Sequence, residues 1–364
     1  MVVGGVTRAL GYAKGANSKG ITAFEFDEGD GSAKVAQVVG GVENPTFLSL
    51  DPSGPFLNVT CEIDGWNEGV VVTYAIERTG GALTYLNLQS SRGSYAVHSA
   101  ADHSGRLLFA VNYGAGPTTQ RPNRSLVVYP RRAGGEIGAP LFEATHEGTG
   151  PVAARQERPH AHSVHVSANN RFAVAVDLGI DALMVYRFDA AAATVEAHGR
   201  FAMPPGSGPR HLAFHPRLPI AYVVNELNST LSTLSFDESA GRFAALAHAR
   251  TIPAAETRTN HCSEVRVSAD GGHVYAANRG CDTIARFAVD PRSGVAALVD
   301  AAACGGETPR HFALDPSGAF LAVANQDSDQ ITIFRVDPVS GALTALGKPI
   351  AVGTPTSIVF ARLA

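Results

Sequence analysis

The chain has 364 residues, of which 45% are hydrophobic and only 17% charged, so it can bury a large core and is too apolar for a disordered protein. Its formal net charge is −4, so no overall basic field favours nucleic acid or an anionic membrane surface, and any anion site must be local. No apolar run reaches the roughly 18 residues of a membrane-spanning helix, and residues 1–15 lack the pattern of a secretory signal, so we expect a cytoplasmic protein.

The first predicted strands occupy residues 9–12 and 21–27, and a repeat follows them. In its two clearest copies, residues 209–211 and 309–311 both read Pro-Arg-His. In each copy an Asn lies sixteen positions after the Pro. The same spacing recurs in six copies, so the fold is built from repeated units. Their paired anchors are Pro45 and Cys61, Ala96 and Asn112, Ala161 and Asp177, Pro209 and Asn225, Cys262 and Asn278, and Pro309 and Asn325.

Each copy contains four predicted strands, as in residues 211–215, 220–225, 230–236 and 243–250. Turns rich in Pro, Gly and Asp separate them, as in residues 315–318, where the Gly suits a positive-φ position. The second anchors follow one another at intervals of 47 to 65 residues. Four strands in a repeat of this length are typical of a propeller blade rather than of a solenoid coil.

A seventh copy is divided between the two ends of the sequence. Residues 353–360 repeat the opening strand, and we expect the strands at 9–12 and 21–27 to complete the same blade. A shared blade closes the ring and removes exposed strand edges. The predicted fold is therefore an all-β, seven-bladed β-propeller with four antiparallel strands per blade, forming a single domain over residues 1–364.

The interval of 65 residues before Asp177 is the longest, and the excess lies within residues 114–158. One interpretation is a simple surface excursion. The other is a flap over one mouth of the channel, because long loops often carry function.

Charged and histidine side chains collect at one end of the predicted channel. The first strand of each blade lines the channel and the second runs antiparallel beside it, so the start of one and the end of the other meet at the same face. The residues that this register brings to that face are His98, His162, Arg210, His211, Glu226, Glu264, Arg279, Arg310 and His311.

This enrichment predicts a site for an anionic substrate. The planar guanidinium fork of arginine suits a carboxylate or phosphate and can stabilise a developing oxyanion. A Glu or His beside the arginines could act as a general base on water. The alternative is that the arginines and glutamates form a purely structural ion-pair network.

The sequence contains no dedicated metal motif. It has no H-E-x-x-H, and its four cysteines form no C-x-x-C pair, as expected of reduced core cysteines. A metal site built from Glu226, Glu264 and several histidines is an alternative. We expect neither a metal nor another cofactor.

Several stretches of the chain resemble the seven-bladed propeller lactonases of the bacterial 6-phosphogluconolactonase type. Fungal carboxy-cis,cis-muconate cyclase shares that architecture, and the resemblance covers essentially the whole length. The matching stretches are Pro-His-Ala-His-Ser-Val at 159–164, Gly-Pro-Arg-His at 208–211 with Phe-His-Pro at 214–216, Val-Asn-Glu-Leu-Asn-Ser at 224–229, Ala-Asn-Arg at 277–279 and Thr-Pro-Arg at 308–310.

The resemblance implies a set of catalytic residues. A His, two Arg and a Glu line the proposed site of the cyclase, and through these motifs they fall on His162, Arg210, Glu226 and Arg279. His162 is preferred to His160 because it shares the repeat register of Arg210. The remaining residues of the set are predicted to bind substrate, namely Arg310, His211, His311, Glu264 and His98.

The predicted function is metal-independent hydrolysis of a sugar lactone, with 6-phosphoglucono-1,5-lactone as the leading substrate. Glu226 or His162 would act as the general base that activates water, and Glu264 is a third candidate for that role. The alternatives are a lactonizing activity on a muconate-type dicarboxylate and a propeller scaffold without enzymatic activity. We expect a small anionic sugar lactone as partner, no nucleic acid or membrane, and a monomer or weak homodimer.

Overall fold

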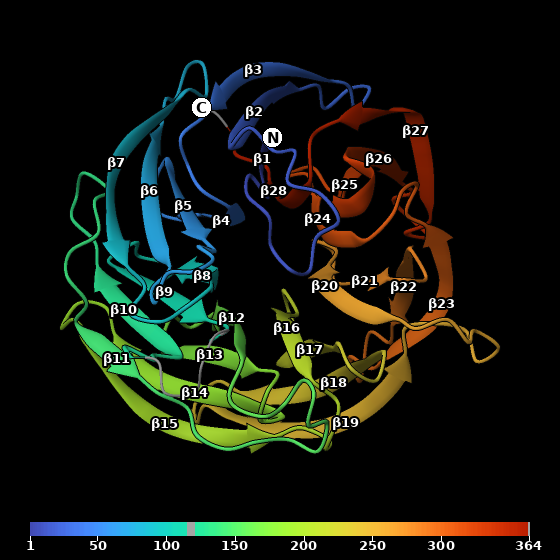
Figure 1. Ribbon diagram of the computed structural model, residues 1–364. Coiled ribbons are helices and arrows are strands. Elements are labelled where there is room, and N and C mark those ends of the chain that lie inside the picture. The colour runs from blue at the N-terminus through green and yellow to red at the C-terminus, as the bar shows by residue number, and fades with distance from the viewer. Residues whose placement is uncertain (115–120, 363–364) are drawn as a thin grey trace. The chain divides into compact units, whose positions relative to one another are not determined.

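The computed structural model describes residues 1–114 and 121–362. Within them lie 28 β-strands and one short 3-10 helix, η1 (Gln326–Ser328). The strands form seven antiparallel sheets of four strands each (Figure 1). This composition confirms the all-β, seven-bladed β-propeller fold that the repeat predicts.

The chain packs into two compact units, each of which is described by itself. Unit 1 consists of Met1–Gly41, Arg210–Phe236 and Phe243–Arg362, and unit 2 of Val42–Pro209 and Asp237–Arg242. The expectation of a single domain stays a prediction.

Unit 1 contains the sheet shared by the two ends of the chain and three further sheets. The shared sheet has the order β28 (Pro355–Val359), β1 (Val2–Gly5), β2 (Ile21–Phe26) and β3 (Ala33–Val39). The next sheet falls almost wholly in this unit and contains β16 (Pro209–Phe214), β17 (Ile220–Asn225), β18 (Thr230–Asp237) and β19 (Arg242–Arg250). The other two contain β20 (His261–Val267), β21 (His273–Arg279), β22 (Thr283–Val289) and β23 (Ala296–Ala303), and β24 (Pro309–Leu314), β25 (Phe320–Asn325), β26 (Gln330–Val336) and β27 (Leu343–Ala351).

Unit 2 contains three sheets. The first has β4 (Pro45–Leu50), β5 (Phe56–Cys61), β6 (Val70–Ile76) and β7 (Leu83–Ser90). The second has β8 (Ala96–Ala101), β9 (Leu107–Asn112), β10 (Leu126–Pro130) and β11 (Phe142–Ala144). The third has β12 (Ala161–Val166), β13 (Phe172–Asp177), β14 (Ala182–Asp189) and β15 (Thr194–Ala202).

The shared blade is present, but its second strand differs from the prediction. β28 pairs with β1, with Val2 opposite Val359 and Val3 opposite Ile358, and the two strands lie side by side in Figure 1. The prediction of a strand at 9–12 is wrong, because these residues lie in the loop between β1 and β2. Val2 and Val3 are buried between their neighbouring strands, whereas the loop contains a turn in which the Ala13 N–H donates to the Leu10 carbonyl.

The first strand of most blades carries a β-bulge at its second residue. In β4, β8, β12 and β24 the pairing with the next strand skips the residue after the first anchor, and in β20 it skips two. A bulge leaves a residue out of the ladder and redirects its side chain. The skipped residues are Thr46, Val97, His162 and Arg310, and Ser263 with Glu264.

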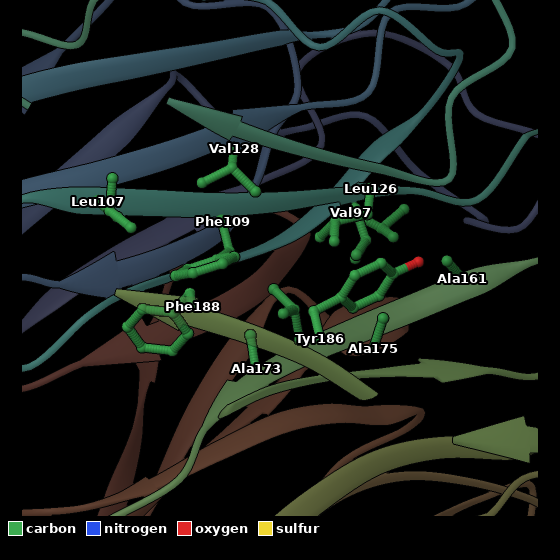
Figure 2. Close-up of a cluster of buried hydrophobic side chains, with 12 residues drawn as sticks. Val97, Leu107, Phe109, Leu126, Val128, Ala161, Ala173, Ala175, Tyr186 and Phe188 are labelled. Atoms are coloured by element: carbon green, nitrogen blue, oxygen red, sulfur yellow. The ribbon is translucent and has the colours of Figure 1, made fainter. Parts of the chain in front are cut away.

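Apolar side chains pack between neighbouring sheets within each unit. Figure 2 shows one such cluster in unit 2, in which Phe109 of β9 and Phe188 of β14 meet with their ring centroids 5.1 Å apart. All six residues of β9, β13, β17 and β25 are buried, whereas most residues of the fourth strands β15 and β19 are exposed. These four second strands are therefore covered on both faces, and each pairs with the first strand of its blade.

The excursion at residues 114–158 contributes two strands, β10 and β11, to its sheet. His146 in this segment is fully buried, with Nδ1 at 2.6 Å from Asp177 Oδ2 and Nε2 at 2.8 Å from the Tyr186 hydroxyl. These contacts fasten that part of the excursion to β13 and β14. Residues 115–120 lie outside the described part of the chain, and the expectation of a flap stays a prediction.

No helix in the described residues is long and apolar enough to cross a membrane.

Candidate active site

Three charged residues from two neighbouring sheets meet in unit 1. Arg210 is the second residue of β16, Glu226 follows the end of β17 and Arg279 is the last residue of β21. Arg210 Nε donates to Glu226 Oε2 at 3.0 Å, and Arg279 Nη2 lies 2.8 Å from the same oxygen. One carboxylate oxygen therefore holds both guanidinium groups.

The backbone of β20 fixes the two arginines from another side. Arg210 Nη1 donates to the Ser263 carbonyl, and Arg279 donates to the carbonyls of His261 at 3.2 Å and Cys262 at 3.0 Å. The bulge in β20 interrupts its ladder with β21 just after Cys262. Carbonyls beside such an interruption can accept from side chains, so the bulge supplies the acceptors that orient both guanidinium groups.

Arg210 is far more buried than is usual for an arginine at the mouth of a channel. An arginine at a channel mouth should be solvated, yet Arg210 and Glu226 are each only 3% exposed. Arg210 and Glu226 pair with each other away from water, and the Ser263 carbonyl of β20 accepts a further hydrogen bond from Arg210. A buried charge of this kind is tolerated only when it is paired and hydrogen-bonded.

Charged groups of both signs surround Arg210. Burial is the main reason that its pKa falls to about 9, and the charges of Arg279 and Arg310 lower the pKa further, against the opposing effect of Glu226 and Glu264. Together with Arg210 itself, the cluster holds three guanidinium groups and two carboxylates. The chain as a whole carries a net charge of −4, so the excess of one positive charge in this cluster is a local feature.

A second network in unit 1 is centred on Glu264, which is 1% exposed. Its Oε2 lies 3.1 Å from His211 Nδ1 and 3.0 Å from His311 Nε2. Its Oε1 accepts the Val265 N–H at 3.0 Å and lies 3.4 Å from Arg266 Nε. Sequence reasoning missed Arg266, although period-2 alternation places it on the same face of β20 as Glu264.

Burial, above all, lowers the pKa of His311 from its ordinary 6.5 to about 3. Below about pH 6.5, His311 is therefore protonated in the unfolded chain but stays neutral in the folded protein. The free energy of unfolding consequently falls as the pH falls, by about 1.4 kcal/mol per pH unit. We expect urea unfolding between pH 6.5 and pH 5 to show a steeper loss of stability for the native protein than for His311→Gln. Equal slopes would contradict this pKa.

Arg310, at the bulge of β24, makes a different contact. Its guanidinium carbon lies 3.9 Å from the ring centroid of Tyr12, and the side chain is half-buried. Within residues 1–114 and 121–362, no side chain or backbone group pairs with this guanidinium through a hydrogen bond or ion pair. Sequence reasoning missed Tyr12, because no repeat spacing fixes the conformation of the loop between β1 and β2.

The other two predicted histidines, His98 and His162, lie in unit 2. His162 occupies the bulge of β12 with its ring edge-on to Tyr113, at a centroid distance of 5.6 Å. His98 stacks on Phe47 at 4.0 Å. His160 is held differently, since its Nδ1 lies 2.7 Å from the Tyr113 carbonyl and its Nε2 3.2 Å from Glu157 Oε2.

The structure therefore brings Arg210, Glu226 and Arg279 together, and separately His211, Glu264 and His311. No group of three or more His, Cys, Asp or Glu side chains among the described residues is placed to hold a metal ion. In the candidate metal set of the sequence, Glu226 is paired with arginines instead. The arrangement suits anion binding and the stabilisation of negative charge.

Comparison with known proteins identifies the family. Residues 1–360 match the family described as "Lactonase, 7-bladed beta-propeller". The chain belongs to this family. It is a lactonase, an enzyme that hydrolyses a cyclic carboxylic ester, as the resemblance implies.

Similar proteins match this lactonase over nearly their whole length. It is 34% identical over 349 residues to a Bacillus subtilis protein named 6-phosphogluconolactonase, covering 96% of each chain. It is 31% identical to a protein of the same name from Formosa agariphila, covering 93% of this chain and 94% of that one. Among solved structures, a periplasmic gluconolactonase of Pseudomonas aeruginosa is 32% identical, with a TM-score of 0.89 and coverage of 100% and 99%.

Proposed function

We propose that this lactonase opens the ring of a sugar lactone, with 6-phosphoglucono-1,5-lactone as its substrate. The names of the Bacillus subtilis and Pseudomonas aeruginosa proteins support the sugar lactone. The observation that carries the proposal is the pair of guanidinium groups on one oxygen of Glu226, that of the buried Arg210 and that of the partly buried Arg279. Such a pair is prearranged to accept negative charge without reorganising.

In this reaction a water oxygen attacks the lactone carbonyl carbon, and the carbonyl oxygen becomes an oxyanion. Arg210 and Arg279 donate to that oxyanion, and Glu226 holds them in place. Within unit 1, Glu226 is the candidate for the base that takes the proton from water. When the oxyanion collapses, the bond from carbon to the ring oxygen breaks, the ring oxygen takes a proton, and an open-chain acid results.

Arg310 is proposed to bind the phosphate. Its guanidinium lies over the Tyr12 ring and has no anionic partner among the described residues. A planar fork of this kind suits two phosphate oxygens. A phosphorylated substrate also supports a cytoplasmic location, because charged phosphate esters do not cross membranes unaided. The expected assembly is a monomer or weak homodimer.

We expect Arg310→Ala to raise the KM for 6-phosphoglucono-1,5-lactone by about 10- to 100-fold, the worth of a charge-assisted hydrogen bond of roughly 1.5–3 kcal/mol. The KM for unphosphorylated glucono-1,5-lactone should change little. A matched control is Arg335→Ala, since Arg335 also lies over a ring, that of Phe320, but is exposed on β26. An equal rise in KM for both lactones would remove Arg310 from the phosphate site.

The substrate class is tested by measuring hydrolysis of both sugar lactones and of a carboxymuconolactone, after subtraction of the spontaneous rate. We expect acceleration with the sugar lactones and the higher kcat/KM with the phosphorylated one. Turnover of the muconolactone alone would favour the lactonizing activity on a dicarboxylate. Acceleration of none of the three would contradict the proposal.

A further inference from the structure

The Glu264 network reaches Arg210 through a histidine. Glu264 sits on the bulge of β20, His211 on β16 and His311 on β24, so the network joins three sheets of unit 1. All three side chains are buried. His211 Nε2 lies 3.2 Å from Arg210 Nη1, and the Ile358 N–H of β28 donates to His311 Nδ1 at 3.2 Å.

The partners decide where the histidine hydrogens lie. A guanidinium can only donate, so His211 Nε2 accepts from Arg210, and the ring hydrogen is on Nδ1, facing Glu264. His311 Nδ1 accepts a backbone N–H, so its hydrogen is on Nε2, which also faces Glu264. Both rings are therefore neutral, and both donate to the same carboxylate oxygen.

Arg266 completes the surroundings of Glu264. Its Nη2 lies 3.2 Å from His311 Nε2, but that nitrogen already carries the hydrogen given to Glu264. Arg266 therefore acts as a positive charge beside the carboxylate, with its Nε 3.4 Å from Oε1. With all these donors around it, Glu264 is engaged as an acceptor on both oxygens.

We propose that Glu264 is a positioning residue for the reaction, which acts through His211 on Arg210. By accepting the Nδ1 hydrogen, Glu264 holds His211 in the tautomer whose Nε2 lone pair faces Arg210 Nη1. The guanidinium is then fixed by His211 and Ser263 on one side and by Glu226 on the other. In this role Glu264, His211 and His311 orient the oxyanion donor and do not touch substrate. The proposal rests on the proposed function of Arg210.

The test is steady-state kinetics of Glu264→Gln on a sugar lactone. We expect kcat to fall by about 10- to 100-fold, because a displaced donor loses much of its effect, while KM stays within about twofold. The matched control is Asp315→Asn, a buried carboxylate of unit 1 that caps the turn between β24 and β25. It should lose stability and keep its kcat. Wild-type kcat in a folded Glu264→Gln protein would overturn the proposal.

If Glu264→Gln fails to fold, a pair of His311 variants tests the same positioning role. A glutamine can donate its amide hydrogen to Glu264 and accept the Ile358 N–H with its carbonyl, so His311→Gln should keep most of the native kcat. His311→Leu supplies neither bond, and we expect its kcat to fall as in Glu264→Gln. Equal kcat values in the two variants would contradict the chain of contacts.

A spectroscopic measurement separates this inference from the proposed function. Nitrogen-15 NMR of the histidine rings distinguishes the two neutral tautomers. We expect the Nδ1–H form for His211 in the native protein and a loss of that form in Glu264→Gln. An Nε2–H tautomer of His211 would overturn the positioning role, whereas a correct tautomer in a protein without lactonase activity would overturn only the proposed function.

Discussion

Replacing Arg210 by alanine should lower kcat for lactone hydrolysis by about 10²- to 10³-fold, the effect of removing one oxyanion donor worth roughly 2.7–4 kcal/mol. Arg210 is the more buried of the two guanidinium groups on Glu226. Glu226 would still be paired with Arg279 at 2.8 Å, so the substitution leaves no isolated buried carboxylate. We therefore expect a folded protein with a lower melting temperature, measured by steady-state kinetics and thermal unfolding.

Arg210→Lys is the informative companion to this variant. A lysine keeps the charge, but one ammonium group cannot donate to Glu226, the Ser263 carbonyl and His211 with the geometry of the planar fork. We expect little recovery of kcat. If both variants keep the native kcat, the Arg210 cluster is a structural ion-pair network and not a catalytic one, whatever their melting temperatures.

Deleting residues 353–364 should destabilise the protein severely. The deletion removes β28, whose pairing with β1 carries the shared blade, and with it Ile358, which is fully buried. Loss of a single buried Ile side chain costs about 2–5 kcal/mol, and an unpaired β1 would leave an exposed strand edge. We expect insolubility or a melting temperature lower by roughly 10 °C or more, recorded by circular dichroism.

The control for this deletion removes only residues 361–364 and keeps β28 intact. That variant should melt close to the full-length protein. A protein without residues 353–364 that melts as the full chain does would show that the shared blade adds nothing to stability.

The blades could be predicted from the sequence because each copy of the repeat keeps the same spacing between its two anchor residues. In blade four the predicted strands at 220–225 and 230–236 agree with β17 (Ile220–Asn225) and β18 (Thr230–Asp237) to within one residue. The N-terminal half-blade has no anchor pair, so nothing in the sequence distinguished residues 9–12 from Val2–Gly5 as its strand. Tyr12 was misplaced for that reason, and its contact with Arg310 could not be foreseen.

The residues of the candidate site could be predicted from the sequence, but the hydrogen bonds between them could not. Regular alternation places only one of two consecutive residues on a given face, yet both Ser263 and Glu264 are left out of the ladder in β20. A bulge has no reliable sequence signal, so the Ser263 carbonyl that accepts from Arg210 could not be predicted. The tautomer of His211 likewise depends in part on Glu264 of β20, which is 53 residues away in the sequence.

The most direct test of the account is the rate of 6-phosphoglucono-1,5-lactone hydrolysis by the native protein and by Glu226→Gln, each corrected for spontaneous opening. Glu226 holds both Arg210 and Arg279, so its replacement disturbs the oxyanion donors whether or not it is also the base. We predict clear acceleration by the native protein and a rate near the spontaneous one for a Glu226→Gln protein shown by circular dichroism to be folded. Native turnover by that folded variant would contradict the claim that this cluster is the site of lactone hydrolysis.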